Sequence, residues 1–105
     1  MERKLAGLKP EKVFYYFEEL TKIPRGSGNE QAVSNYVAEF GRTRGWKVIQ
    51  DKFWNVAIDV PASPGYEARK KLILQAHLDM VCAAEDGVNF DFSSQPLDIY
   101  VEDGY

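Results

Sequence analysis

The sequence predicts an α/β fold in which two N-terminal helices pack on a mixed β-sheet. Apolar residues recur at helical spacing in the first part of the chain, and the pattern changes to strand-like alternation after Gly45. The length of 105 residues corresponds to about one small domain, which is enough for one hydrophobic core. We therefore expect residues 1–105 to form a single domain.

The first helix is expected from about Pro10 to Lys22, because proline is pre-set for the first turn of a helix. Its apolar stripe, at spacings i, i+3, i+4 and i+7, consists of Val13, Tyr16, Phe17 and Leu20. The helix must end near Ile23, since Pro24 disfavours helical backbone in the residue before it. The adjacent acids Glu18-Glu19 are interpreted as part of a solvated helix face.

The second helix follows a loop that ends at Glu30. Ser27 and Glu30 have the spacing of a capping box, in which each side chain accepts a hydrogen bond from the other residue's amide. The apolar stripe consists of Val33, Tyr36, Val37 and Phe40. Gly45 lies where a left-handed C-terminal cap is expected. Ser27 is accordingly interpreted as a helix cap and not as a nucleophile.

Strands are expected in the second half of the chain. Residues 46–51 form the first, and residues 56–60 alternate apolar and polar side chains in the second. Residues 71–81 open with an uninterrupted apolar run, which is typical of a central strand covered on both faces. A last strand is expected over 98–102.

The end of the chain carries a hairpin signal. Asp103-Gly104 after a strand calls for a returning strand, yet only Tyr105 follows. We expect that the chain is truncated from a longer protein; the alternative is a frayed terminus.

Composition and charge exclude several classes of partner. Apolar residues make up 45% and charged residues 28%, as in a soluble globular protein. Sixteen acidic and thirteen basic residues give a net charge of -3 without a basic patch, so nucleic acid is not an expected partner. No apolar run approaches the roughly 18 to 20 residues of a membrane span, and no signal peptide is evident. A single cysteine, Cys82, suits a reducing compartment, so we expect a cytoplasmic protein.

His77 and Asp79 are the candidate site residues. On an extended strand, residues two apart point to the same face, so the two side chains can cooperate. A carboxylate on one ring nitrogen of a histidine fixes the tautomer and makes the other nitrogen a better metal ligand. Ligands of open α/β sheets gather at the carboxyl ends of central strands, where this pair is expected.

Two separated motifs resemble the N-terminal part of the aminoacyl-histidine (Xaa-His, cytosolic β-Ala-His) dipeptidases, which belong to the zinc aminopeptidase and carboxypeptidase superfamily. They are Ile23–Glu30 and Leu74–Cys82, and the resemblance extends over residues 8–105. Ala76 departs from the pattern, because this position is usually glycine in the family.

The resemblance implies that the chain is the first portion of an α/β/α zinc-peptidase catalytic domain. It implies that His77 binds one ion of a two-metal centre, with zinc as the metal and manganese or cobalt as alternatives. Asp79 is then the catalytic residue that orients His77. A small peptide of the Xaa-His type would be hydrolysed by a metal-bound water. The remaining ligands of the family are absent from this sequence, so we expect at most one weak metal site and no activity of the chain alone.

Two other functions remain open: another metal-dependent tripeptidase or deacylase of the same superfamily, and a non-catalytic binding or oligomerising module left by truncation. Cys82 is interpreted as a small buried hydrophobe and not as a reactive thiol. Trp46, Phe53 and Trp54 are interpreted as core or covering residues. If the central strand lacks neighbours, its exposed edge should promote self-association.

Overall fold

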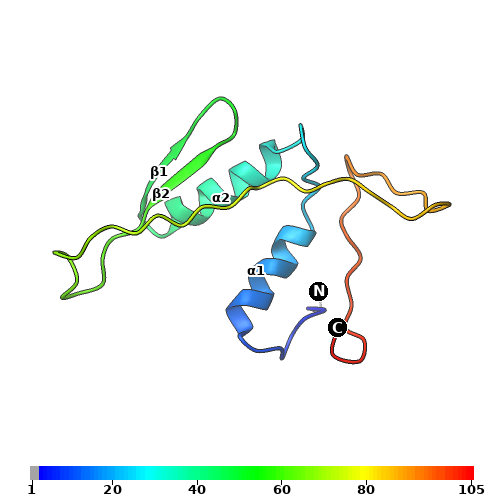
Figure 1. Ribbon diagram of the computed structural model, residues 1–105, viewed down its shortest axis with the longest axis horizontal. Helices are drawn as coiled ribbons and strands as arrows, with labels where there is room; N and C mark the ends of the chain where they lie inside the picture. Colours follow the sequence, from blue (N-terminus) through cyan, green and yellow to red (C-terminus); the bar gives the residue numbers. More distant parts are fainter. Residues whose placement is uncertain (1–2) are drawn as a thin grey trace.

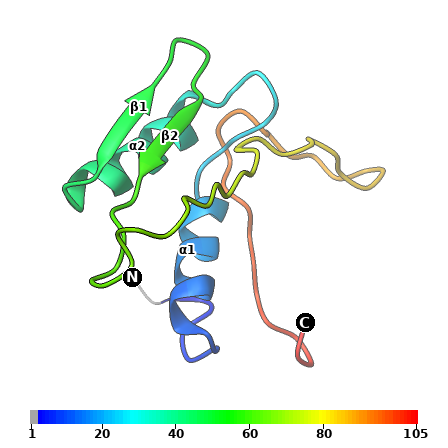
Figure 2. The same cartoon turned by 60° about the vertical axis from the view of Figure 1, so that its left-hand side comes forward.

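The computed structural model describes residues 3–105, in which two helices precede a two-stranded hairpin. The elements are α1 (Glu11–Thr21), α2 (Gln31–Thr43), β1 (Lys47–Gln50) and β2 (Val56–Asp59). Figure 1 shows α2 lying along the hairpin, with α1 in a separate position. After β2 the chain runs as long extended segments, which Figure 2 shows from the side. The radius of gyration is therefore 16.6 Å, against about 13 Å for a compact domain of this length.

Helix α1 confirms the first predicted helix, and it ends at Thr21, just ahead of Pro24. The interpretation of Glu18 as a solvated residue is wrong, since it is 4% exposed and accepts a hydrogen bond from the Leu5 amide at 2.9 Å. The predicted apolar stripe is only partly covered, because Val13 and Phe17 remain more than half exposed. The N-terminal segment thus covers a different face of α1 from the one that the stripe indicated.

Helices α1 and α2 are joined through aromatic side chains. The rings of Tyr16 and Phe40 meet edge to face with centroids 5.2 Å apart. Arg44 lies over Phe40, with its guanidinium carbon 3.5 Å from the ring centroid, and donates to the Tyr16 hydroxyl at 2.6 Å. This contact fixes the end of α2 against α1.

Helix α2 packs on both strands of the hairpin and confirms the second predicted helix. Val33 and Ala38 are fully buried on its inner face. At Gly41 the helix approaches the sheet so closely that an added Cβ would lie 2.6 Å from a methyl of Val48. Gly45 follows the helix with φ of 75°, which confirms the predicted left-handed cap.

Strands β1 and β2 pair antiparallel, with Val48 opposite Ile58. The Asp51 carboxylate closes the turn between them by accepting hydrogen bonds from two backbone amides, those of Phe53 and Asn55, each at 2.9 Å. A hydrogen bond from the Asn55 side chain is the largest cause that holds the pKa of Asp51 below its ordinary value, and the two backbone bonds act in the same direction. The interpretation of Phe53 as a covering residue is wrong, because it is exposed at the tip of the hairpin, whereas the two tryptophans are partly buried.

The predicted central strand over 71–81 is wrong as a sheet strand. The segment is extended, but in the described residues its pairing is limited to one parallel bridge between Gly26 and Met80. Leu72, Ile73 and Leu74 are 83–87% exposed. The α/β class is confirmed, whereas the sheet in residues 3–105 is antiparallel and not mixed.

The predicted strand over 98–102 is also absent from the described structure. Just before it, the Leu97 amide donates to the carbonyl of Thr21, the last residue of α1, at 2.9 Å. The hairpin turn at Asp103-Gly104 is confirmed: both residues have positive φ, and Glu102 and Tyr105 exchange backbone hydrogen bonds of 3.0 and 2.9 Å. Neither α1 nor α2 has the length and apolar character that crossing a bilayer requires, within the part of the chain described here.

Candidate functional site

The candidate site forms where the loop before α2 meets the end of the extended 71–81 segment. The Met80 amide donates to the Arg25 carbonyl at 2.9 Å, and Gly26 and Met80 form the parallel bridge. The Arg25 side chain adds a further contact, because its Nη1 donates to the Leu78 carbonyl at 3.2 Å. We call this pair of segments, 25–27 and 78–80, the clasp. It brings residues that are far apart in sequence next to each other.

Within the clasp, Asp79 lies between a serine and a histidine. One carboxylate oxygen, Oδ2, accepts a hydrogen bond from the Ser27 hydroxyl at 2.5 Å. The other, Oδ1, lies 3.1 Å from Nδ1 of His77. The order of contacts is Ser27, Asp79, His77, so the histidine does not contact the serine in the manner of a nucleophile and its base. The grouping is suited to orienting an imidazole.

The capping box predicted for this loop is wrong. Helix α2 has Glu30 as its N-cap and no side-chain cap, so Ser27 does not close the helix. The Glu30 carboxylate accepts instead from the Gly28 amide at 2.6 Å. This arrangement leaves the Ser27 hydroxyl available for Asp79.

The surroundings of His77 determine its tautomer. Nδ1 lies 2.7 Å from the backbone carbonyl oxygen of Asp79 as well as 3.1 Å from the carboxylate. Both partners are acceptors, so Nδ1 must carry the hydrogen. In the neutral ring, Nε2 then carries a free lone pair, and it is the atom that a metal ion or a proton would bind.

The electrostatics of the pair favour an ionised carboxylate. The hydrogen bond from Ser27 is the largest cause that holds the pKa of Asp79 below its ordinary value, and the bond with His77 acts in the same direction against partial burial. The His77 side chain is 81% exposed and that of Asp79 is 32% exposed. A negative charge behind the ring and an open ring face are both properties of a metal-binding histidine.

The fit of a metal ion to these residues is partial. His77 supplies an oriented imidazole, which is a good zinc ligand. Residues 3–105 contain no group of three or more histidine, cysteine or acidic side chains that could hold a metal ion. In the described residues this pair thus offers one imidazole and one carboxylate, fewer groups than a zinc site ordinarily uses.

Cys82 lies at the edge of the clasp and is exposed, so its interpretation as a buried hydrophobe is wrong. Its Sγ lies over Gly26, in the space that a Cβ on that glycine would occupy. A side chain at position 26 would therefore compete with Cys82 beside the parallel bridge.

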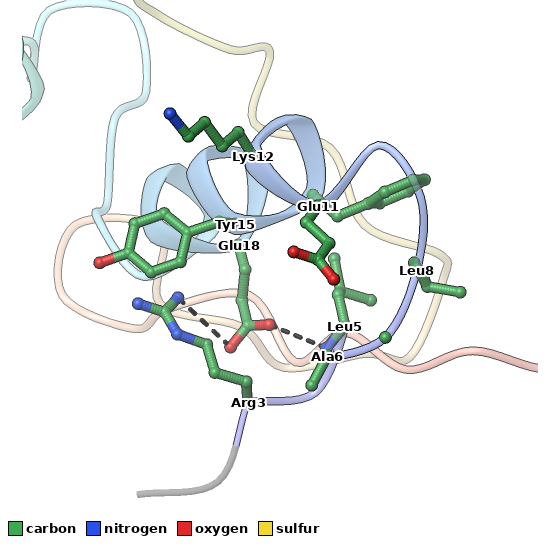
Figure 3. Close-up of a pocket in the computed structure, with 10 residues that line it drawn as sticks. Arg3, Leu5, Ala6, Leu8, Glu11, Lys12, Tyr15 and Glu18 are labelled. Atoms are coloured by element: carbon green, nitrogen blue, oxygen red, sulfur yellow. Dashed lines mark hydrogen bonds and ion pairs between the residues drawn. The ribbon is translucent and has the colours of Figure 1, made fainter.

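A pocket of about 330 Å³ lies away from this pair, between the N-terminal segment and α1. Figure 3 shows the Glu18 carboxylate at its wall, with one oxygen on the Leu5 amide and Arg3 beside the other at 3.9 Å. Arg3 also stacks on Tyr15, with its guanidinium carbon 3.8 Å from the ring centroid. Both oxygens of Glu18 thus face the N-terminal segment, and these contacts attach that segment to α1.

Sequence reasoning missed the roles of Ser27 and Arg25. Both are in the Ile23–Glu30 motif, so the signal that something important lies there was present. What local pattern could not show is the contact with Leu78 and Asp79, because these are more than fifty positions away.

Two comparisons with known proteins point in the same direction. The chain is 32% identical over 99 residues to the cytosol non-specific dipeptidase of Escherichia coli (strain K12), a match that covers 94% of this chain and 20% of that protein. Its fold is similar to the crystal structure of aminoacylhistidine dipeptidase from Vibrio alginolyticus, with a TM-score of 0.89, 31% identity, and coverage of 97% of this chain and 21% of that one. No family model matches the chain. The chain thus spans about one fifth of the length of the relatives that it matches.

Proposed function

Because this chain is related in sequence and fold to the aminoacylhistidine dipeptidases, we propose that it forms the N-terminal portion of the catalytic domain of a metal-dependent dipeptidase. The relatives are dipeptidases, which hydrolyse peptide bonds. The observation that carries the proposal is the contact of His77 Nδ1 with the backbone and carboxylate oxygens of Asp79, which favours hydrogen on Nδ1 and a free lone pair on Nε2. This is the arrangement that a metal-binding imidazole needs.

His77 would hold one divalent ion through Nε2, and Asp79 would orient the ring from behind. Zinc is the metal we propose, in a two-metal centre, because imidazole suits zinc; manganese and cobalt are the alternatives. The chemistry that such ions supply when bound is activation of a water and polarisation of the scissile carbonyl. The part of this chain is to set the direction and basicity of one ligand.

For the substrate we propose small dipeptides, with the Xaa-His type first. The structural relative acts on aminoacylhistidines according to its name, which supports this choice, whereas the name of the Escherichia coli relative indicates a broader range. A cytoplasmic location is proposed from the cytosolic relative and the single cysteine of the chain.

The isolated chain of 105 residues should be inactive, because it supplies one ligand where a catalytic zinc site needs three and an open position for water. The test incubates the purified chain with zinc, manganese or cobalt and with β-Ala-His or Leu-His. We expect no chelator-sensitive hydrolysis, and weak zinc binding that His77→Ala removes. The matched control is Asp86→Asn, which changes an exposed acid outside the clasp.

Two outcomes would contradict the proposal. Turnover by the chain alone that His77→Ala abolishes would show that the ligand set has been misjudged. Zinc binding that is the same in His77→Ala and in the unmodified chain would remove His77 from the metal centre. In a longer natural protein that contains these residues, hydrolysis of Leu-His that survives His77→Ala would remove it as well.

A further inference from the structure

The Ser27 hydroxyl is a polar group that the proposed function does not use. It contacts neither the imidazole nor the free Nε2 side of the ring. Its observed partner is Oδ2 of Asp79, at 2.5 Å, while Oδ1 of the same carboxylate faces Nδ1 of His77 at 3.1 Å. The two oxygens of one carboxylate are thus divided between a serine on one segment and a histidine on the other.

We propose that Ser27 is a positioning residue that holds the Asp79 carboxylate in the rotation that keeps hydrogen on Nδ1 of His77 and leaves Nε2 free. The proposal deepens the proposed function, on which it rests for the purpose of the free Nε2. A carboxylate can rotate about its terminal torsion at little cost, because sp³–sp² torsions are broad. A hydrogen bond to one oxygen limits that rotation and so determines where the other oxygen lies.

The backbone of the clasp puts Ser27 in this position independently of its side chain. The Met80 amide donates to the Arg25 carbonyl, and Gly26 forms a parallel bridge with Met80, so Ser27 and Asp79 each adjoin one bridged residue and lie diagonally across the bridge. The Arg25 guanidinium adds a third contact, at the Leu78 carbonyl. Because none of these contacts uses the Ser27 hydroxyl, the orienting effect can be tested apart from the attachment of the two segments.

The alternative role for Ser27, as cap of α2, does not agree with the structure, since Glu30 is the N-cap. The effect expected from Ser27 is nevertheless partial. The backbone carbonyl of Asp79 also accepts from Nδ1, at 2.7 Å, and no side-chain substitution removes it. Loss of the serine hydroxyl should therefore shift the tautomer equilibrium of His77 without inverting it.

The experiment uses the metal-free chain at a pH where imidazole is neutral. His77 is the single histidine of the sequence, so ¹⁵N spectra report the protonation of its two ring nitrogens without overlap. The variants are Ser27→Ala, and Ser27→Thr, which keeps the hydroxyl. Ser93→Ala is the matched control, because it removes a 2.6 Å serine-to-aspartate hydrogen bond, to Asp91, outside the clasp. Hydrogen exchange of the Met80 amide reports separately whether the clasp persists.

In Ser27→Ala we expect the population of the Nε2–H tautomer to rise several-fold while the Met80 amide stays protected. Ser27→Thr should restore the original ratio, and Ser93→Ala should not change it. Zinc affinity, measured with zinc alone, should fall by up to about 10-fold in Ser27→Ala, the lower end of the effect of outer-sphere partners.

An unchanged tautomer ratio in Ser27→Ala would overturn the proposal. A changed ratio with loss of Met80 protection would also overturn it, because Ser27 would then merely hold the segments together. Since the tautomer is measured without metal, a failure of His77 to bind zinc would count against the proposed dipeptidase centre and leave the result on Ser27 standing.

Discussion

Substitution of Gly41 by alanine should destabilise the domain, although alanine is the better helix former. A Cβ at this position would lie 2.6 Å from Cγ2 of Val48, and 3.1 and 3.2 Å from two carbons of Ile58. Ordinary carbon contacts are about 3.5 to 4.0 Å, so α2 would have to move outward by about 1 Å or both side chains would have to leave their rotamers. Val48 and Ile58 are register partners on β1 and β2, so the new methyl would press on a cross-strand pair.

The magnitude follows from two opposing effects. Overpacking a core contact destabilises by about 1 to 3 kcal/mol, and with two branched side chains involved we expect the upper end of that range. The change from glycine to alanine in a helix stabilises by about 0.5 to 1 kcal/mol. The net loss for Gly41→Ala should be about 2 kcal/mol, which lowers the melting temperature of a domain of this size by about 10 °C.

A matched control is Gly26→Ala in the clasp. Gly26 is also buried, and an added Cβ would meet the Sγ of Cys82. Unlike Val48 and Ile58, Cys82 is exposed and its side chain can turn into solvent. The free energy of unfolding should change by less than about 1 kcal/mol in Gly26→Ala. The rotamer change of Cys82 destabilises the folded state, whereas alanine stabilises it by lowering the conformational entropy of the unfolded chain.

The assay is thermal and urea unfolding of both variants, followed by circular dichroism. Equal shifts of the melting temperature in the two variants would refute the reasoning, because the expected difference arises from the packed neighbours of Gly41 and the mobile neighbour of Gly26. So would a higher melting temperature for Gly41→Ala, because α2 would then not lie against the sheet as described. Reducing Val48 to alanine in the Gly41→Ala background should recover part of the lost stability.

Three further predictions concern the site, pH and association. In zinc titrations His77→Ala should abolish binding, whereas Asp79→Asn should weaken it by about 10-fold, because the backbone carbonyl still holds Nδ1; equal losses would contradict this difference. The hydrogen bond from the Leu5 amide holds the pKa of Glu18 below its ordinary value of 4.5. The ionised carboxylate therefore stabilises the fold above pH 4.5, and this stabilisation is lost as the pH falls through the lower pKa of the folded state. Hydrogen exchange of the Leu5 amide should increase in acid, and Glu18→Gln should remove that pH dependence. The exposed edge at Leu72–Leu74 should cause self-association that a lysine at position 73 reduces, and light scattering that shows a strict monomer at high concentration would contradict it.

The helices and the hairpin could be predicted because their signals are local. The stripe of α2, Gly45 at its end and the alternation of Val56 and Ile58 each lie within a few residues, and the structure confirms all three elements. The same local reasoning failed for Glu18, because its position on the polar face of α1 predicted that it would be exposed to solvent. The N-terminal segment covers that face, and no periodicity within α1 could show it.

The central strand could not be predicted correctly from its composition. The run at Leu72–Leu74 is a pattern for burial on two faces, but a strand exists only when another strand accepts its hydrogen bonds. In residues 3–105 the pairing of the 71–81 segment is limited to the bridge between Met80 and Gly26, which does not include Leu72–Leu74. The prediction was therefore correct about the extended backbone that the segment adopts and wrong about its surroundings.

The candidate site divides in the same way. The two residues were expected to approach because they are two apart on a strand. They do approach, with Nδ1 and Oδ1 3.1 Å apart, but across a bend at Leu78 and not along a strand. Ser27 was assigned to a local cap because capping boxes are recognised over three residues. Its observed partner is a carboxylate fifty-two positions away, which only the folded chain brings near.

The exposed apolar run and the open imidazole belong to the same segment, so in the proposed dipeptidase stability and metal binding would be linked. Leu74 and His77 are three residues apart, about 10 Å along extended backbone, so in the proposed dipeptidase a strand of a few residues that covers the edge at Leu74 would also run past His77. In the proposed dipeptidase, burial of the edge and completion of the ligand set would then occur together. Metal binding would be coupled to folding, because a site that is assembled only in the covered state adds its binding free energy to the stability of that state. On our proposal the clasp would prepare for this step, since Ser27 and Asp79 would set the direction of the imidazole before any further ligand arrives.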